Sequence, residues 1–369
     1  MWGLARRNLA KERIRLAVSV GGVAFAVLLI VLIRGLFVAY ETKVEDFYGR
    51  TGADLWVVQA GTADLIHGMS LLPDALADPL AEVEGVAGVW PYVSRQYGFD
   101  LAGEDTLVNL VGFDPDEPVA GPVELVRGSA EVGADGIVID EVFANRHALA
   151  LGDRLVLGGR SLEIAGIGRG GDMVMYQYAF ADTAVVRDII DAPETNMALL
   201  VALEPGADPQ VVAADIAAAS PQVMVKTAEE VVAEARAVIN DGFLPVIAVL
   251  LVIGFLVGVA VVGLTIYSAV LERRREYGML KALGARGGQV VAVVSLQALL
   301  AAAGGYVAGL GLAWLAVQAT TRWVPAFVTT IRPGDLAWVA AATVGMALLA
   351  ALLPLVRIAR IDPAEVFRA

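Results

Sequence analysis

The sequence predicts a helical membrane protein with four transmembrane helices and an α+β extracytoplasmic domain between helices one and two. Of the 369 residues 57% are hydrophobic and the mean hydropathy is +0.67, which is too apolar for an ordinary soluble protein. Four stretches reach the roughly 20 apolar residues that a helix needs to cross about 30 Å of hydrocarbon. Some 200 residues of ordinary globular composition separate the first two stretches.

The four predicted spans differ in how clearly they are bounded. They run from about Leu16 to Val38, Phe243 to Val270, Val290 to Ala319 and Leu336 to Val356. The first could also be a cleaved signal peptide, but its apolar core exceeds the usual length of roughly 7 to 15 residues and no small-x-small site follows. We therefore expect a retained span. The third is long enough to tilt, or to break near Gly304 and Gly305.

Charge is divided between the two predicted regions. Residues 41–241 hold 34 Asp and Glu against 11 Lys and Arg, which leaves 6 acidic and 16 basic residues for the rest. The outer domain is therefore acidic and the membrane part basic. Nucleic-acid binding is not expected, since the large folded domain offers no basic face for phosphates.

The basic residues beside the spans predict the orientation, because Lys and Arg resist translocation. Clusters lie before the first span, between the second and third, and after the fourth: Arg6, Arg7, Lys11, Arg13 and Arg15; Arg273, Arg274, Arg275, Lys281 and Arg286; Arg357, Arg360 and Arg368. Both termini are expected in the cytoplasm and residues 41–240 outside. Within the spans, Arg34 is an isolated charge, so no charged pathway is visible. The GxxxG pairs Gly254/Gly258 and Gly305/Gly309 permit close helix contact within or between subunits.

The outer domain reads as mixed strands and helices broken by Gly, Pro and Asp. Strands are expected at Asp54–Gln59, Leu107–Gly112, Gly136–Ile139, Arg154–Leu157, Leu162–Ile167 and Met197–Leu203. Helices are expected at Leu72–Glu82, Glu141–Leu149, Thr183–Ile190 and Pro209–Ala219. A further helix from about Thr227 to Asn240 leads into the second span without a flexible linker. Tyr40, Phe47 and Tyr48 are expected to pack at the other junction.

The outer domain carries little recognisable chemistry. The chain has no cysteine, and His67 and His147 lack a metal-ligand pattern. The segment Met173 to Phe180 has large side chains on both faces beside flexible glycines. It predicts either a buried strand, which we favour, or contact with a hydrophobic substrate or partner through Met173, Met175, Tyr176 and Tyr178.

The most specific pattern lies at residues 271–288, LERRREYGMLKALGARGG, after the second span. Its apolar residues recur at helical spacing behind a basic start, which predicts a short amphipathic helix. A generic interfacial helix on anionic headgroups has the same composition. The segment ERRREYGMLKALGA resembles the ERR(R/K)EIGILRALGA signature of the MacB/FtsX-type (FtsX-like, LolC/DevC-like) ABC transporter permeases, with Tyr277 replacing the usual Ile. The end of the chain, RIARIDPAEVFRA, and its start are similar to the same family.

The resemblance implies a division of the chain and of labour. It implies an amino-terminal helix and first span in residues 1–40, a MacB-like periplasmic domain in 41–240, and an FtsX-like permease domain in 241–369. It also implies that the coupling helix docks on a cytoplasmic ABC ATPase. The residues expected at that contact are Glu272, Arg273, Arg274, Arg275, Glu276, Tyr277, Met279, Leu280 and Leu283.

The family also suggests what the chain assembles with and does. No Walker A pattern occurs, so ATP and Mg are expected on a separate ATPase subunit, with no cofactor, metal or catalytic residue in this chain. A second permease copy, as homodimer or heterodimer, and an extracytoplasmic partner such as a membrane-fusion protein are expected, in the bacterial cytoplasmic membrane. Two functions stay open: export or extraction of a hydrophobic or amphipathic substrate, and FtsX-like signalling to a cell-wall hydrolase.

Overall fold

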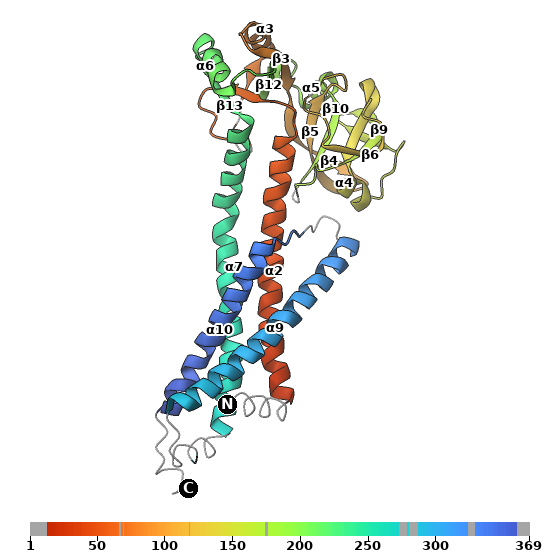
Figure 1. The fold of residues 1–369 in the computed structure, drawn as a ribbon. Helices are drawn as coiled ribbons and strands as arrows, with labels where there is room; N and C mark the ends of the chain where they lie inside the picture. The colour runs from red at the N-terminus through yellow and green to blue at the C-terminus, as the bar shows by residue number, and fades with distance from the viewer. Residues whose placement is uncertain are drawn as a thin grey trace. The chain divides into compact units, whose positions relative to one another are not determined.

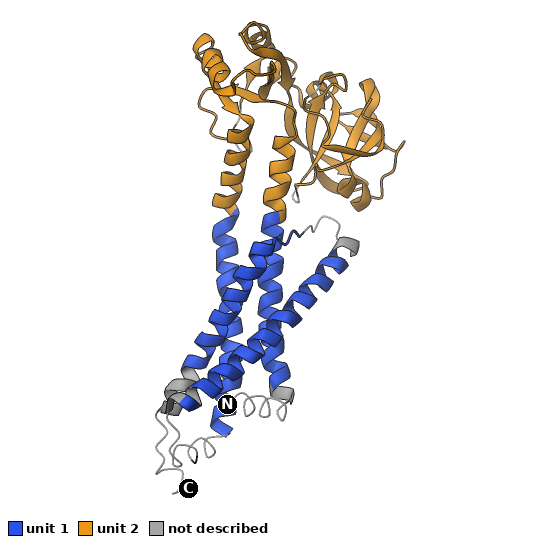
Figure 2. Ribbon diagram, in the orientation of Figure 1, with its two compact units in different colours: residues 1–38, 243–324, 328–369 blue, residues 39–242, 325–327 orange. Residues whose placement is uncertain are grey.

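The computed structural model describes residues 13–65, 68, 70–117, 119–173, 176–272, 279, 287–323 and 329–359. They fall into two compact units, which are coloured separately in Figure 2. Unit 1 lies within residues 1–38, 243–324 and 328–369, and unit 2 within residues 39–242 and 325–327.

Four long helices contain the apolar stretches (Figure 1). They are α2 (Arg13–Gly49), α7 (Ala228–Glu272), α9 (Gly287–Trp323) and α10 (Pro333–Ala359). By length and composition each can cross a membrane, which confirms the four predicted helices. Helix α7 begins at Ala228, so the predicted continuation into the second span is also confirmed. Helix α2 passes the expected end at Val38 and continues to Gly49, because residues beyond the apolar stretch pack in unit 2.

Small residues allow the helices of unit 1 to approach closely. A Cβ added at Gly309 of α9 would lie 2.7 Å from the Val27 Cβ of α2, and one at Gly258 of α7 would lie 3.1 Å from the Ala26 Cβ. Gly305 faces Val23 in the same way. These glycines therefore serve helix contacts inside one chain. Helix α9 is continuous through Gly304 and Gly305, so the suggested break there is wrong; the backbone needs none because α2 fills the space left by the missing side chains.

Unit 2 contains two larger sheets. The four-stranded sheet has the antiparallel order β13-β1-β12-β3. The seven-stranded sheet has the order β4-β5-β10-β7-β9-β6, with β8 on β9, and is parallel only at β5/β10 and β7/β9. The strands of the first are β1 (Leu55–Gln59), β3 (Val86–Tyr92), β12 (Ala198–Leu203) and β13 (Val223–Thr227). Those of the second are β4 (Ser94–Leu101), β5 (Glu104–Phe113), β6 (Glu124–Gly128), β7 (Gly136–Asp140), β8 (Arg154–Leu157), β9 (Arg160–Arg169) and β10 (Gln177–Asp182).

Short elements complete unit 2. The helices are η1 (Asp74–Leu76), α3 (Ala77–Ala81), η2 (Gly133–Asp135), α4 (Glu141–Arg146), α5 (Thr183–Ile190) and α6 (Pro209–Ala219), and β2 (Leu72–Pro73) pairs with β11 (Thr195–Asn196). Each larger sheet has its own core: Leu55, Leu80, Leu199 and Ile216 belong to one, and Leu110, Ile139, Phe143 and Ile167 to the other. We call these parts the four-strand lobe and the seven-strand lobe.

Two predicted helices are shorter than expected, each for a local reason. The stretch Leu72–Glu82 begins as strand β2 because Pro73 disfavours the helical conformation at the residue before it. The predicted helix Glu141–Leu149 ends at Arg146, since Ala148 adopts a left-handed conformation with φ of 54°. All six predicted strands, and the helices α5 and α6, are present.

Candidate functional site

Two of the expected ATPase-contact residues are described. Glu272 is the last residue of α7 and is exposed, and Met279 is helical with 49% of its surface exposed. The others lie outside the described residues: Arg273, Arg274, Arg275, Glu276, Tyr277, Leu280 and Leu283. The exposed thioether of Met279 is available to a partner, and the role of the segment stays a prediction.

The segment from Met173 to Phe180 runs into the seven-stranded sheet. Strand β10 begins at Gln177, and Met173 and Tyr178 are 1% and 2% exposed. Tyr178 is thus buried in a strand, as we favoured, whereas Met173 is buried in the segment before the strand; the contact role of the segment stays a prediction. Tyr176 is partly exposed, and Met175 lies outside the described residues. Of the proposed contact residues, Tyr176 is therefore the described one with surface open to a ligand.

Aromatic rings join the part of α2 that belongs to unit 2 to both larger sheets. Phe47 stacks on Tyr178 of β10 with ring centroids 3.9 Å apart, and Tyr48 meets Trp56 of β1 edge on at 5.9 Å. Trp56 in turn contacts Tyr92 of β3 at 5.0 Å. These five rings, which we call the aromatic cluster, are all buried. The expected packing of Phe47 and Tyr48 at this junction is confirmed, and it places the end of α2 between two sheets.

An ion pair reinforces the same junction. Lys43 of α2 pairs with the Asp172 carboxylate, and Gln177 donates a hydrogen bond of 2.9 Å from Nε2 to Oδ1 of Asp172. Asp140 lies near this pair and accepts hydrogen bonds from the backbone N–H groups of Val142 and Gly171. Burial raises the pKa of Asp140 to about 6, and the Asp172 charge adds to that effect while Lys43 and the two N–H donors oppose it.

A buried lysine connects the first turns of α7 to the four-stranded sheet. Lys226, at the end of β13, is 4% exposed and contacts the carbonyl oxygens of Thr62 and Ala63 and, at 2.6 Å, the Glu234 carboxylate. Three acceptors match the three donors of an ammonium group. Two residues further along the helix Arg236 pairs with Glu45 of α2. The parts of α2 and α7 that belong to unit 2 are therefore connected to each other as well as to the sheets.

A planar cluster links the two lobes of unit 2. The Arg187 guanidinium of α5 donates to both carboxylate oxygens of Asp74, at 2.5 and 2.6 Å, and to Oδ1 of Asn196 at 2.6 Å. The hydrogen bonds from Arg187 hold the pKa of Asp74 below its usual value, and Asn196 contributes in the same sense. Such bidentate pairs fix orientation as well as distance. The cluster therefore sets how α5 meets the 3-10 helix η1.

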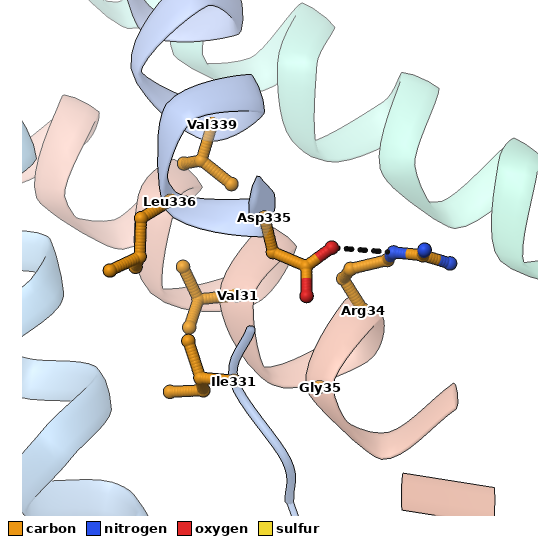
Figure 3. Close-up of a pocket in the computed structure, with 7 residues that line it drawn as sticks. All are labelled: Val31, Arg34, Gly35, Ile331, Asp335, Leu336 and Val339. Carbon is orange, nitrogen blue, oxygen red and sulfur yellow. Dashed lines mark hydrogen bonds and ion pairs between the residues drawn. The ribbon is translucent and has the colours of Figure 1, made fainter. Parts of the chain in front are cut away.

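In unit 1 one ion pair joins α2 to the start of α10 (Figure 3). Nε of Arg34 donates to Oδ1 of Asp335 at 3.1 Å, and the backbone N–H of Thr330 donates to the Gly35 carbonyl at 3.0 Å. The cavity beside this pair has a volume of about 10 Å³, which holds about one water molecule. The ion pair and the backbone hydrogen bond connect the two helices beside this small cavity.

Sequence reasoning missed most of these contacts. Lys43, Asp172, Arg187 and Asp335 are single charged residues far apart in sequence, and no spacing relates them. The isolated Arg34 was the one usable signal, since a charge inside a span implies a partner. Among the described residues no group of three or more His, Cys, Asp or Glu side chains could hold a metal ion.

Comparisons with known proteins agree with this architecture. Residues 16–219 match the MacB-like periplasmic core domain, and residues 248–363 match the FtsX-like permease C-terminal domain. The chain therefore belongs to the MacB/FtsX-type ABC transporter permeases. Such a permease implies a cytoplasmic ATPase as partner.

Individual relatives and solved structures are similar to this chain at sequence identities of 14% to 27%. The uncharacterized ABC transporter permeases Rv0072 and Rv2563 of Mycobacterium tuberculosis are 25% and 27% identical over 365 and 367 residues, covering 97% of this chain and 96% of each relative. The periplasmic region of MacB from Actinobacillus actinomycetemcomitans aligns with 49% of this chain and 92% of its own, at 14% identity and a TM-score of 0.38. The extracellular domain of the noncanonic ABC-type transporter YknZ from Gram-positive bacteria aligns with 47% of this chain and 100% of its own. The sequence identity is 14% and the TM-score 0.36.

Proposed function

We propose that this permease couples ATP hydrolysis by a separate cytoplasmic ATPase to movement of its outer unit, and that this movement exports or extracts a hydrophobic or amphipathic substrate. ATP and Mg would bind to the ATPase, and the permease would pair with a second permease copy in the bacterial cytoplasmic membrane, with both termini inside. An extracytoplasmic partner such as a membrane-fusion protein would receive the substrate.

One observation carries the coupling part of this proposal. Helices α2 and α7 each contribute residues to both units without a break in the helix. A continuous helix transmits displacement along its axis, because its backbone hydrogen bonds resist stretching and bending. The outer-unit part of α2 is held by the aromatic cluster and by Lys43, and that of α7 by Lys226. Displacement of either helix in the membrane would therefore act on the sheets.

Two features of the described spans support the proposed site of action. The charged pair among the described span residues, Arg34 and Asp335, closes on itself, and the cavity beside it admits no solute. This favours action on molecules outside the bilayer or in its outer leaflet. Tyr176, with Met175 beside it in sequence, is the proposed point of contact. The alternative is a signalling permease that regulates a cell-wall hydrolase through the same movement without carrying a substrate.

The test is the contact with the ATPase. Leu280→Asp places a charge on the apolar side of the predicted coupling helix, and burial of an unpaired charge at an interface anchor typically costs about 2 kcal/mol or more. We expect this variant to insert normally but to lose both co-purification of the ATPase and stimulated ATP hydrolysis. Arg273→Gln is the matched control, because an exposed ion pair is worth about 0 to 1 kcal/mol. Retention of both properties by Leu280→Asp would contradict the coupling role.

A further inference from the structure

The seven-strand lobe has no chain connection of its own to a membrane helix. It is inserted in the four-strand lobe: β4 begins at Ser94, directly after β3 ends at Tyr92, and α5 ends at Ile190 before β11 begins at Thr195. The four-strand lobe, in contrast, continues from β13 into α7 at Ala228. Contacts between a membrane helix and the seven-strand lobe must therefore be non-covalent.

Two side chains of α2 make such contacts. Lys43 and Phe47 are one helical turn apart, so they lie on the same face of the helix. Lys43 pairs with Asp172, which lies between β9 and β10, and Phe47 stacks on Tyr178 in β10. Both receiving residues belong to one short stretch of the seven-strand lobe, in which Asp172 also forms a β-bridge with Gln177.

The Asp172 carboxylate is held on both sides. Its Oδ2 faces Lys43 and its Oδ1 accepts the 2.9 Å hydrogen bond from Gln177 of β10. The side chains of Asp172 and Lys43 are 4% and 17% exposed. Separating the pair would leave a charge buried without a counter-charge, which is far costlier than opening an exposed pair. The contact therefore resists displacement of the helix relative to the sheet.

We propose that Asp172 is the positioning residue through which α2 moves the seven-strand lobe. This inference rests on the proposed function, since it assigns a residue to the transmission of movement from the membrane helices. When α2 moves, the ion pair with Lys43 displaces the Asp172 carboxylate, and the hydrogen bond from Gln177 transmits this displacement to β10. The stacking of Phe47 on Tyr178 resists rotation of the helix about its own axis. The four-strand lobe is joined by the backbone to α7 at Ala228 and to α2 through the five residues between Gly49 and Leu55, so a movement of α2 relative to that lobe would turn the seven-strand lobe against it.

The first experiment measures, without nucleotide, how firmly the end of α2 is held against the seven-strand lobe. The chain has no cysteine, so spin labels can be placed at Gly49→Cys, where an added side chain meets nothing within 4 Å, and at the exposed Glu131→Cys in the seven-strand lobe. We expect a narrow distance distribution in the labelled parent protein and a distribution at least twice as wide in Asp172→Asn. Lys43→Met, which removes the charge and keeps an unbranched side chain one atom shorter, should widen it equally.

The control is an ion pair on the same helix. Asp46 pairs with Arg50 at 3.8 Å, and both side chains are more than half exposed. Asp46→Asn should leave the distribution unchanged. An unchanged distribution in both Asp172→Asn and Lys43→Met overturns the proposal. If Asp172→Asn fails to fold by circular dichroism, Lys43→Met alone decides.

The second experiment uses the complete complex with its ATPase. Labels at Glu131→Cys and at the exposed Gln210→Cys of α6 report the distance between the lobes, with and without trapped ATP. The parent should shift its distance on ATP trapping, Asp172→Asn should lose the shift, and Asp46→Asn should keep it. A parent that shifts together with an Asp172→Asn variant that shifts equally overturns this inference alone. A parent that does not respond to ATP overturns the proposed function and the transmission role with it.

Discussion

Phe47 of α2 stacks on Tyr178 of β10 with ring centroids 3.9 Å apart and an angle of 19° between the ring planes. The two residues are 3% and 2% exposed. Tyr178 also shares a side-chain hydrogen bond with Tyr48, so two neighbouring residues of one helix contact the same ring. Burial raises the pKa of Tyr178 well above its ordinary value, and the hydroxyl stays protonated at any physiological pH. The aromatic cluster itself is therefore uncharged, and the charges beside it are those of Lys43, Asp172 and Asp140.

The stacked pair predicts a large effect of truncation. Phe47→Ala removes a buried ring and leaves a cavity at the junction, and such changes typically cost about 3 to 5 kcal/mol. Tyr178→Phe keeps the ring and removes the hydrogen bonds that its hydroxyl shares with Tyr48 and Tyr176, each of which is typically worth about 1 kcal/mol. Denaturant unfolding of the purified protein in detergent, followed by tryptophan fluorescence to which the buried Trp56 contributes as one of six tryptophans, measures both. Equal destabilisation by the two variants would contradict the importance of the stack.

The raised pKa of Asp140 predicts that unit 2 loses stability as pH rises. Its folded pKa of about 6 exceeds the ordinary value of 3.8 because the carboxyl is buried. The folded state therefore binds the proton more tightly, and the stabilisation present below pH 4 is lost as pH rises through 6. The change in the free energy of unfolding is at most about 3 kcal/mol.

The matched variant for this prediction is Asp140→Asn, which cannot titrate. It should flatten the dependence of the unfolding midpoint between pH 4 and 7, although it loses one of the two backbone hydrogen bonds from Val142 and Gly171. Unfolding curves at four or five pH values decide the matter. An equally steep dependence in wild type and variant would assign the effect to another group.

The elements that could be predicted are those whose signal is local. Long apolar stretches gave all four membrane helices, and runs such as LWVVQ at β1 or GIVID at β7 alternate with turn residues and gave buried strands. Strands β4 and β6 were missed because their side chains are largely exposed, with Arg95, Gln96 and Glu124 at the surface. An edge strand of mixed polarity carries no periodic pattern that separates it from a loop.

The functional contacts could not be predicted, for a different reason. Lys43 and Asp172 are separated by 129 positions and Arg187 and Asp74 by 113, so only the tertiary fold brings them together. The GxxxG pairs could be seen in the sequence, but only the packing of Gly305 and Gly309 on α2 shows that they act within one chain. The pattern of the Met173 to Phe180 segment favoured a buried strand over a ligand contact; Met173 and Tyr178 are buried, and the contact role of the segment stays a prediction.

The orientation expected from the basic residues predicts opposite accessibility at two described positions. Asp116 lies in unit 2 and Gly287 at the start of α9, and either can be replaced by Cys in a chain without native cysteines. An impermeant thiol reagent applied to intact cells should label Asp116→Cys and spare Gly287→Cys, which reacts only after permeabilisation. Labelling of Gly287→Cys in intact cells would reverse the positive-inside assignment.

The pair of Arg34 and Asp335 predicts a non-additive double-mutant cycle. Their side chains are 32% and 16% exposed, so removing one partner leaves a partly buried charge and should cost about 2 kcal/mol. Removing both, as Arg34→Leu with Asp335→Leu, should cost less than the sum, because no unpaired charge remains. Thermal unfolding in lipid nanodiscs measures all three variants. Additive losses would show that the pair does not interact.

The helix contact at Gly309 predicts a steric effect that a neighbouring glycine lacks. A Cβ at Gly309 would lie 2.8 Å from the Ala24 carbonyl oxygen, a backbone atom that cannot rotate away, and 2.7 Å from the Val27 Cβ. Gly309→Ala should therefore separate α9 from α2 and lower the free energy of unfolding by about 2 kcal/mol, as overpacking typically does. Gly311 lies on the same helix with nothing within 4 Å of its Cβ position, so Gly311→Ala should be neutral or slightly stabilising. Thermal unfolding in nanodiscs compares the two substitutions directly, since they add the same methyl group two residues apart. Equal stability of the two variants would mean that α9 does not pack on α2 through this face, and the glycine pair would then be available for contacts between subunits.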